Sequence, residues 1–143
     1  MSYKFQNCVN NRSLRRCPID VERAKREILE AKKDLESAKA SLHLSDDKWA
    51  IIKAYFSMFH AFRSLLFRSG YTEKSHECLI IAVEELFIEN GKLPSSIVNN
   101  IRNAKTAREA ADYGCTYGPD TARGAVQDAE EAYRIVVEYI KTG

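Results

Sequence analysis

Arg108 is the residue whose position most needs an anionic partner. Over residues 97–111, apolar residues recur in steps of three and four, as along one side of a helix, and Arg108 falls on that apolar line. An unpaired guanidinium there would cost roughly several kcal/mol, and Asp112, four residues later, would lie beside it. Tyr113 follows at or near the helix end. The three residues could line a groove or a subunit interface, or Arg108 could extend along its aliphatic stem to solvent.

Three histidines could supply acid–base or metal chemistry. His43 lies at a predicted helix end, where it can interact with the last carbonyl groups. His60 lies in an aromatic-rich helix near Arg63; both are candidate ligand-binding residues, although such a histidine is more often a hydrogen-bonded structural residue. His76 and Cys78 form an H-x-C pair, but zinc needs three or four ligands, so we predict no metal. Signatures of phosphate-binding loops, hydrolases and metalloproteases are absent, and no cofactor is expected.

The elements that position these residues are predicted to be helices throughout. Apolar spacings of three and four predict five helices, over about residues 18–42, 46–69, 73–89, 94–113 and 121–140. Ser45 and Thr72 are the expected N-caps of the second and third helices, and Gly70 ends the second. The second helix carries the heaviest apolar load and should be central. No segment shows convincing strand alternation, so we predict an all-α, single-domain, up-and-down bundle of about five helices.

The N-terminal segment differs from the rest in charge. The 143 residues indicate one domain, and the net charge of +2 is too small to indicate nucleic-acid binding. Residues 1–17, however, carry four basic residues and no acid, and they lack helical periodicity. We predict a basic, loosely ordered arm over 1–17, followed by the bundle over 18–143. Arg12, Arg15 and Arg16 could contact a phosphate backbone; a solvated terminus is the alternative.

Compartment and thiol state follow from two further features. No stretch approaches the ~18 apolar residues of a membrane span, and the basic arm over residues 1–17 lacks the apolar core of a signal peptide. We therefore expect a cytoplasmic protein that does not enter a membrane. The cysteines show no C-x-x-C pair and no dense framework, so free thiols are expected. They are Cys8, Cys17, Cys78 and Cys115.

Two segments together resemble a known family. Residues 54–66 read AYFSMFHAFRSLL and are followed by Gly70 and by K-S-H at residues 74–76; residues 108–113 read REAADY. In this order and spacing they resemble the small prokaryotic HEPN-domain proteins, in the branch whose fourth helix ends in R-x-x-x-D-Y. The resemblance covers about residues 19–141. It implies an up-and-down helical bundle, commonly a homodimer, often paired with a small nucleotidyltransferase in toxin–antitoxin-like modules.

The resemblance also implies a site, from which this sequence departs. Nuclease members of the family use an Arg followed after four to six residues by a His, and two copies meet across the dimer to bind and cleave RNA. Here the Arg is Arg108, and Tyr113 occupies the position of the His. A phenol with a pKa near ~10 is a weak base at neutral pH. We therefore predict a HEPN-type module that binds RNA, a nucleotide or a partner protein through Arg108, Asp112 and Tyr113, without efficient catalysis. The alternatives are a metal-independent ribonuclease toxin and a purely structural interaction bundle.

Overall fold

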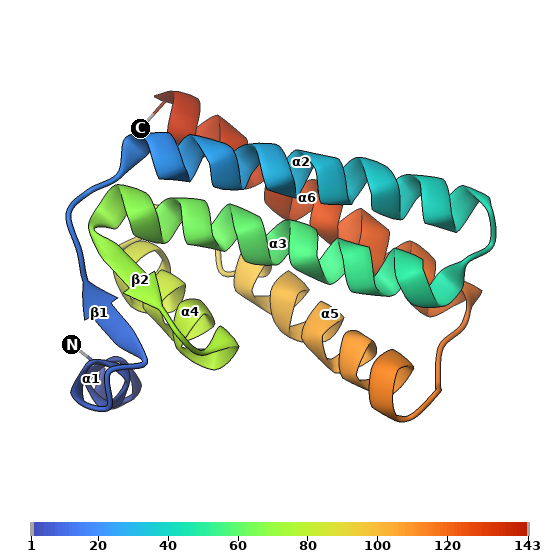
Figure 1. Ribbon diagram of the computed structural model, residues 1–143, viewed down its shortest axis with the longest axis horizontal. Helices are drawn as coiled ribbons and strands as arrows, with labels where there is room; N and C mark the ends of the chain where they lie inside the picture. The colour runs from blue at the N-terminus through green and yellow to red at the C-terminus, as the bar shows by residue number, and fades with distance from the viewer. Residues whose placement is uncertain (1, 143) are drawn as a thin grey trace.

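Four long helices form the body of the molecule. The computed structural model describes residues 2–142, so the ends of the predicted ranges 1–17 and 18–143 lie outside it. Successive long helices run alternately up and down (Figure 1). They are α2 (Val21–His43), α3 (Asp47–Ser69), α5 (Ser96–Tyr113) and α6 (Pro119–Thr142). The shorter α4 (His76–Val83) and the π-helical turn η1 (Glu84–Ile88) lie between α3 and α5. The predicted all-α bundle is confirmed.

The central position predicted for the most apolar helix is also confirmed. α3 packs against α2, α5 and α6, and fourteen of its residues are buried. Its largest fully buried side chains include Tyr55, Phe62 and Phe67. The apolar load of α3 is therefore covered within one chain. No helix within residues 2–142 combines the length and the apolar character needed to cross a membrane.

Two helix starts differ from the expected ones. The side chain of Asp46, and not that of Ser45, accepts the capping hydrogen bond of α3 from the Trp49 N–H. Ser75 caps α4 by accepting from the Cys78 N–H at 3.1 Å, whereas Thr72 lies in a strand. Gly70 ends α3 as expected, with a left-handed φ of 79° that favours glycine.

Residues 3–10 correct the prediction of a loosely ordered arm. They form helix α1 (Tyr3–Asn10), capped by the Ser2 hydroxyl, which accepts from the Phe5 N–H. Phe5 and Cys8 are only 1% and 3% exposed, and the ring of Phe5 meets that of Tyr71 edge-on at 6.0 Å. A two-turn helix that buries two side chains leaves no measurable periodicity in the sequence, which is why its order was missed.

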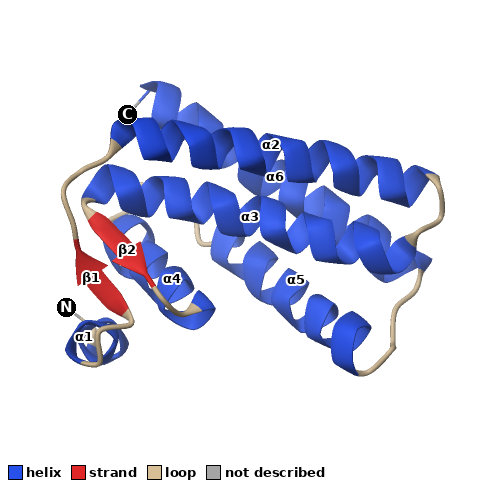
Figure 2. Ribbon diagram, viewed as in Figure 1, coloured by secondary structure: helices blue, strands red, loops and turns tan. Residues whose placement is uncertain are grey.

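A small sheet was also missed. β1 (Leu14–Arg16) pairs antiparallel with β2 (Tyr71–Glu73) (Figure 2). In this pairing Leu14 lies opposite Glu73. Leu14 is 1% exposed and belongs to the core, while Arg15 and Arg16 are exposed. Three residues per strand are too few to show the alternation by which strands are predicted.

The expectation of four free thiols is wrong for two of the cysteines. Cys8 on α1 and Cys78 on α4 form a disulfide that links residues 70 positions apart, whereas Cys17 and Cys115 are free. The pairing depends on how α1 packs against α4, which no local sequence pattern encodes. The disulfide links α1 to α4, and the pairing of β1 with β2 holds the rest of the N-terminal segment against the bundle.

Candidate functional site

Arg108 lies on the side of α5 that faces α3. Earlier residues on that side, such as Ile97, Ile101 and Ala104, are at most 1% exposed, and Arg108 continues the line with a side chain that is 21% exposed. Its Nε–H donates to Oδ2 of Asp112 at 3.3 Å, which confirms the predicted pair. The Asp112 side chain is 26% exposed, so the pair is partly shielded from water.

The guanidinium of Arg108 is held against aromatic rings of α3. It lies 5.1 Å from the ring centroid of Phe56 and 5.4 Å from that of Tyr55, within the range of cation–π attraction. Asp112 engages only Nε, so neither Nη nitrogen has a hydrogen-bond partner within residues 2–142. The two Nη atoms are also not among the buried polar atoms that lack a partner. The two outer nitrogens of the Arg108 fork therefore reach solvent and can bind an anion.

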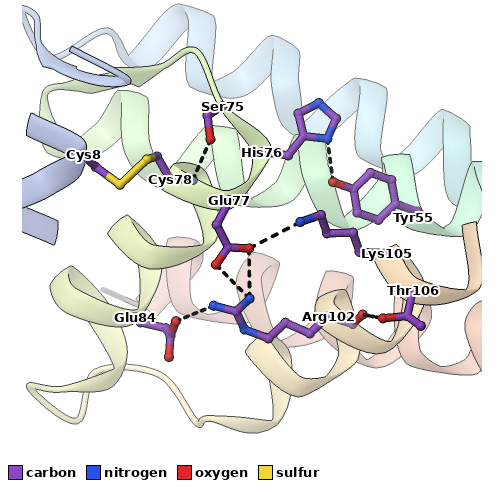
Figure 3. A network of polar contacts seen from close by, with 10 residues as sticks. All are labelled: Cys8, Tyr55, Ser75, His76, Glu77, Cys78, Glu84, Arg102, Lys105 and Thr106. Atoms are coloured by element: carbon purple, nitrogen blue, oxygen red, sulfur yellow. Dashed lines mark hydrogen bonds and ion pairs between the residues drawn. A yellow bond between two sulfur atoms is a disulfide. The ribbon is translucent and has the colours of Figure 1, made fainter. Parts of the chain in front are cut away.

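Arg102, the other arginine of α5, is already paired with carboxylates of α4 and η1. Arg102 donates from Nη1 to both carboxylate oxygens of Glu77, at 3.1 and 3.0 Å, and from Nη2 to Glu84 at 2.9 Å (Figure 3). Lys105 donates to the same Glu77 at 3.3 Å. These contacts connect α5 to α4 and η1. Arg102 and Lys105 are thus paired with carboxylates, whereas the two Nη nitrogens of Arg108 have no protein partner in the described chain.

His76 and Arg108 both lie against the rings of Tyr55 and Phe56. The Tyr55 hydroxyl and Nδ1 of His76 are 2.7 Å apart and hydrogen-bonded (Figure 3). The imidazole also packs against Phe59, with ring centroids 4.5 Å apart. Ser75 positions His76 by capping α4, so the imidazole projects from the first turn of that helix toward α3.

Burial perturbs both titrating groups. It raises the pKa of Tyr55 to about 12, so the phenol stays protonated at physiological pH. Burial also lowers the pKa of His76 below its usual value of 6.5, and the positive charges of Arg108, Lys105 and Arg63 lower it further. His76 is therefore a neutral imidazole at neutral pH.

The candidates His60 and Arg63 belong to a different network. Nδ1–H of His60 donates to Glu27 of α2 at 2.6 Å, and Nη1 of Arg63 lies 3.2 Å from the other oxygen of Glu27. Nε of Arg63 donates to Glu73 of β2 at 3.3 Å, and burial raises the pKa of Glu73 while Arg63 opposes that shift. This network joins α2, α3 and β2, and neither residue forms a hydrogen bond or ion pair with Arg108 within the described chain.

Tyr113 and the basic residues of the N-terminal segment lie apart from each other. Tyr113 ends α5 and is 78% exposed, so its phenol is on the surface. Arg12, Arg15 and Arg16 are exposed, and the last two belong to β1, which lies at the end of the bundle opposite the C-terminus of α5 (Figure 1). Arg16 lies over the Tyr71 ring at 5.3 Å. A single small ligand at Arg108 would therefore not contact these arginines.

Two residues of this site, Tyr55 and His76, were not predicted. In the sequence Tyr55 is one of the apolar residues of the central helix, and His76 stands out only as half of a metal pair. Within residues 2–142 no group of three or more His, Cys, Asp and Glu side chains is placed to hold a metal ion. The signal that could have found His76 is the N-cap Ser75 directly before it, which orients the first turn of α4.

Comparisons with known proteins identify the fold and its family. The family model described as the HEPN domain matches residues 24–140. A curated protein of Methanocaldococcus jannaschii named "Putative toxin MJ0142" is 29% identical over 94 residues, covering 61% of this chain. The match spans 64% of the length of that relative. The crystal structure of TT1696 from Thermus thermophilus is 21% identical and superposes with a TM-score of 0.70 over 82% of this chain and 98% of that one. The likeness to that structure shows a shared fold, and the family match over most of the bundle shows that this chain belongs to the HEPN domain family.

Proposed function

We propose that this HEPN protein binds the phosphate groups of RNA or of a nucleotide at Arg108, without efficient catalysis. The observation that carries the proposal is the state of the Arg108 guanidinium, which is held over two aromatic rings and by Asp112 but keeps both Nη nitrogens free of protein partners in the described chain. A planar fork fixed in this way needs little further ordering to bind two phosphate oxygens.

Two surface tyrosines favour RNA over a free nucleotide. Tyr113 is 78% exposed at the end of α5, and Tyr117 is 51% exposed in the following connection. Exposed aromatic rings near a cation can stack on unpaired bases, which adds affinity for a single strand. A mononucleotide would use only the phosphate contact and one ring.

A ribonuclease toxin is the second candidate function. The likeness to a relative named as a toxin supports it, and so does the resemblance to nuclease HEPN proteins. Against it, the position of the expected histidine is occupied by the exposed phenol of Tyr113, a weak base near pH 7. In a toxin–antitoxin-like module, a small nucleotidyltransferase would be the expected partner.

The binding test uses a fluorescently labelled single-stranded RNA, with AMP as an unlabelled competitor. We expect Arg108→Ala to weaken RNA binding at least tenfold, the loss expected for roughly 1.4 kcal/mol of charge-assisted hydrogen bonding. Arg134→Ala, which removes an equal charge from an exposed position on α6, is the matched control and should bind like wild type. Competition by AMP would show that a nucleotide phosphate is sufficient.

The same RNA is then incubated with wild type and EDTA and analysed for cleavage. We expect intact RNA. Metal-independent cleavage that disappears in Arg108→Ala would replace the binding proposal by the ribonuclease interpretation. Equal RNA binding by wild type and Arg108→Ala would reject Arg108 as a phosphate ligand.

A further inference from the structure

One ring nitrogen of His76, near Arg108, has no hydrogen-bond partner in the described chain. Nδ1 is engaged by the Tyr55 hydroxyl at 2.7 Å, whereas Nε2 makes no hydrogen bond to any residue between 2 and 142. Nε2 is not among the buried polar atoms that lack a partner, so it reaches solvent. A solvent-accessible nitrogen near a free arginine fork is placed to share a ligand with it.

The hydroxyl of Tyr55 decides which form of the imidazole is present. Tyr55 is fully buried, and within the described chain Nδ1 of His76 is the partner of its hydroxyl. A buried O–H that keeps its proton must donate it to an acceptor, so the phenol donates to Nδ1. The neutral ring then carries its own proton on Nε2, which makes Nε2–H a hydrogen-bond donor.

The charges around His76 favour an anionic ligand. The positive charges of Arg108 and Lys105 of α5 and of Arg63 of α3 act on its ring, after burial, to lower its pKa. Arg63 and Lys105 have carboxylate partners, which are Glu27 and Glu73 for the first and Glu77 for the second. Arg108 has one carboxylate partner, on Nε, so both of its Nη nitrogens lack a protein partner in the described chain, as does Nε2 of His76.

We propose that His76 binds the same phosphate as Arg108, with Nε2–H donating to one phosphate oxygen while the Arg108 fork binds the others. This assignment rests on the proposed function. It names the ligand group as the phosphodiester of RNA, and it makes Tyr55 a positioning residue that sets the tautomer of His76. The histidine comes from α4, on a different element from the arginine and 32 residues before it.

The first test measures binding of a short RNA with hydroxyl groups at both ends, whose phosphodiesters keep one charge between about pH 5 and pH 8. We expect His76→Ala to weaken binding roughly tenfold. His76→Gln should retain most of the affinity, because a glutamine amide can place an N–H near the position of Nε2. His43→Ala, at the exposed end of α2, is the matched control and should bind like wild type.

The second test measures whether the bound RNA places negative charge at His76. With three histidines in the chain, the proton resonance of His76 can be assigned by substitution and titrated with and without RNA. A bound phosphate stabilises the protonated ring, so we expect the pKa of His76 to start below 6.5 and to rise when RNA is added. An unchanged pKa would show that no phosphate charge lies at His76 and would count against the proposal.

The outcomes separate this inference from the proposed function. If Arg108→Ala loses binding while His76→Ala binds RNA like wild type and the pKa of His76 does not respond, the role of His76 is rejected and the proposed function stands. If neither substitution affects binding, both fail. RNA cleavage that is lost in His76→Gln would overturn the role of a neutral donor, because it would require the ring to transfer a proton. Normal thermal unfolding of the variants confirms that any loss is not a folding defect.

Discussion

At the scale of single residues, substitution of Glu27 is expected to reduce the stability of the fold strongly. It is 11% exposed, and its two oxygens bind His60 at 2.6 Å and Arg63 at 3.2 Å. Removing it leaves two partly buried polar groups without their partner, so we expect Glu27→Ala to lower the free energy of unfolding by about 3 kcal/mol in urea denaturation. Glu30→Ala, whose pair with Lys33 is exposed, should cost less than about 1 kcal/mol. Similar losses in both variants would contradict a structural role for this network.

His76 should make stability depend on pH. In the unfolded chain it binds a proton below about pH 6.5, but in the folded chain burial lowers its pKa. The unfolded state therefore binds more protons in that window, and the free energy of unfolding falls as the pH drops below about 6.5. We expect a smaller fall in His76→Gln between about pH 7.5 and pH 5.5, measured by urea denaturation. Asp34 and Glu73, whose pKa values are raised by burial, titrate in both proteins. Identical pH dependence in the two proteins would refute the prediction.

At the scale of elements, the disulfide should govern the stability of the N-terminal segment. Cys8 and Cys78 lie 70 residues apart, and a cross-link that closes so long a loop restricts the unfolded chain strongly. We expect reduction with dithiothreitol to lower the free energy of unfolding by roughly 2–4 kcal/mol. A variant carrying both Cys8→Ser and Cys78→Ser should unfold at the same temperature with and without reductant. If wild type were equally insensitive, the disulfide would not contribute.

The basic residues of β1 can be tested without removing the segment. Deleting residues 1–17 would take Phe5 and Leu14 out of the core, so substitution is the cleaner experiment. If Arg15 and Arg16 contact RNA phosphates, replacing both by Gln should reduce the slope of log affinity against log salt by up to about 1.4, or about 0.7 per contact on a single strand. An unchanged slope would show that this strand does not meet the RNA.

At the scale of the whole molecule, we predict a homodimer. The core of α3 is covered within one chain, but two large apolar side chains remain exposed at the α2–α3 connection, one within it and one in the first turn of α3. They are Leu44 and Trp49, and their connection lies at one end of the bundle (Figure 1). Covering them with a second copy would remove apolar surface from water.

Sedimentation equilibrium at micromolar concentration should give twice 16.3 kDa for wild type. We expect Trp49→Glu to shift the protein toward the monomer, because it places a charge in the contact. Leu29→Glu, at an exposed site on α2 outside the α2–α3 connection, should remain dimeric. A wild-type species of 16.3 kDa, or dissociation caused by Leu29→Glu alone, would contradict the predicted interface.

The features that could be read from the sequence are those that depend on neighbouring residues. Helix periodicity repeats every few residues, so five of the helices and the central place of α3 were predictable. The pair of Arg108 and Asp112 was predictable for the same reason, since four residues make about one helical turn. The features that required the tertiary structure join residues far apart in the chain. His76 meets Tyr55 across 21 positions, Glu27 meets His60 across 33, and Cys8 meets Cys78 across 70. Such contacts depend on how the helices pack, and two-turn or three-residue elements such as α1 and β1 are ordered only by that packing.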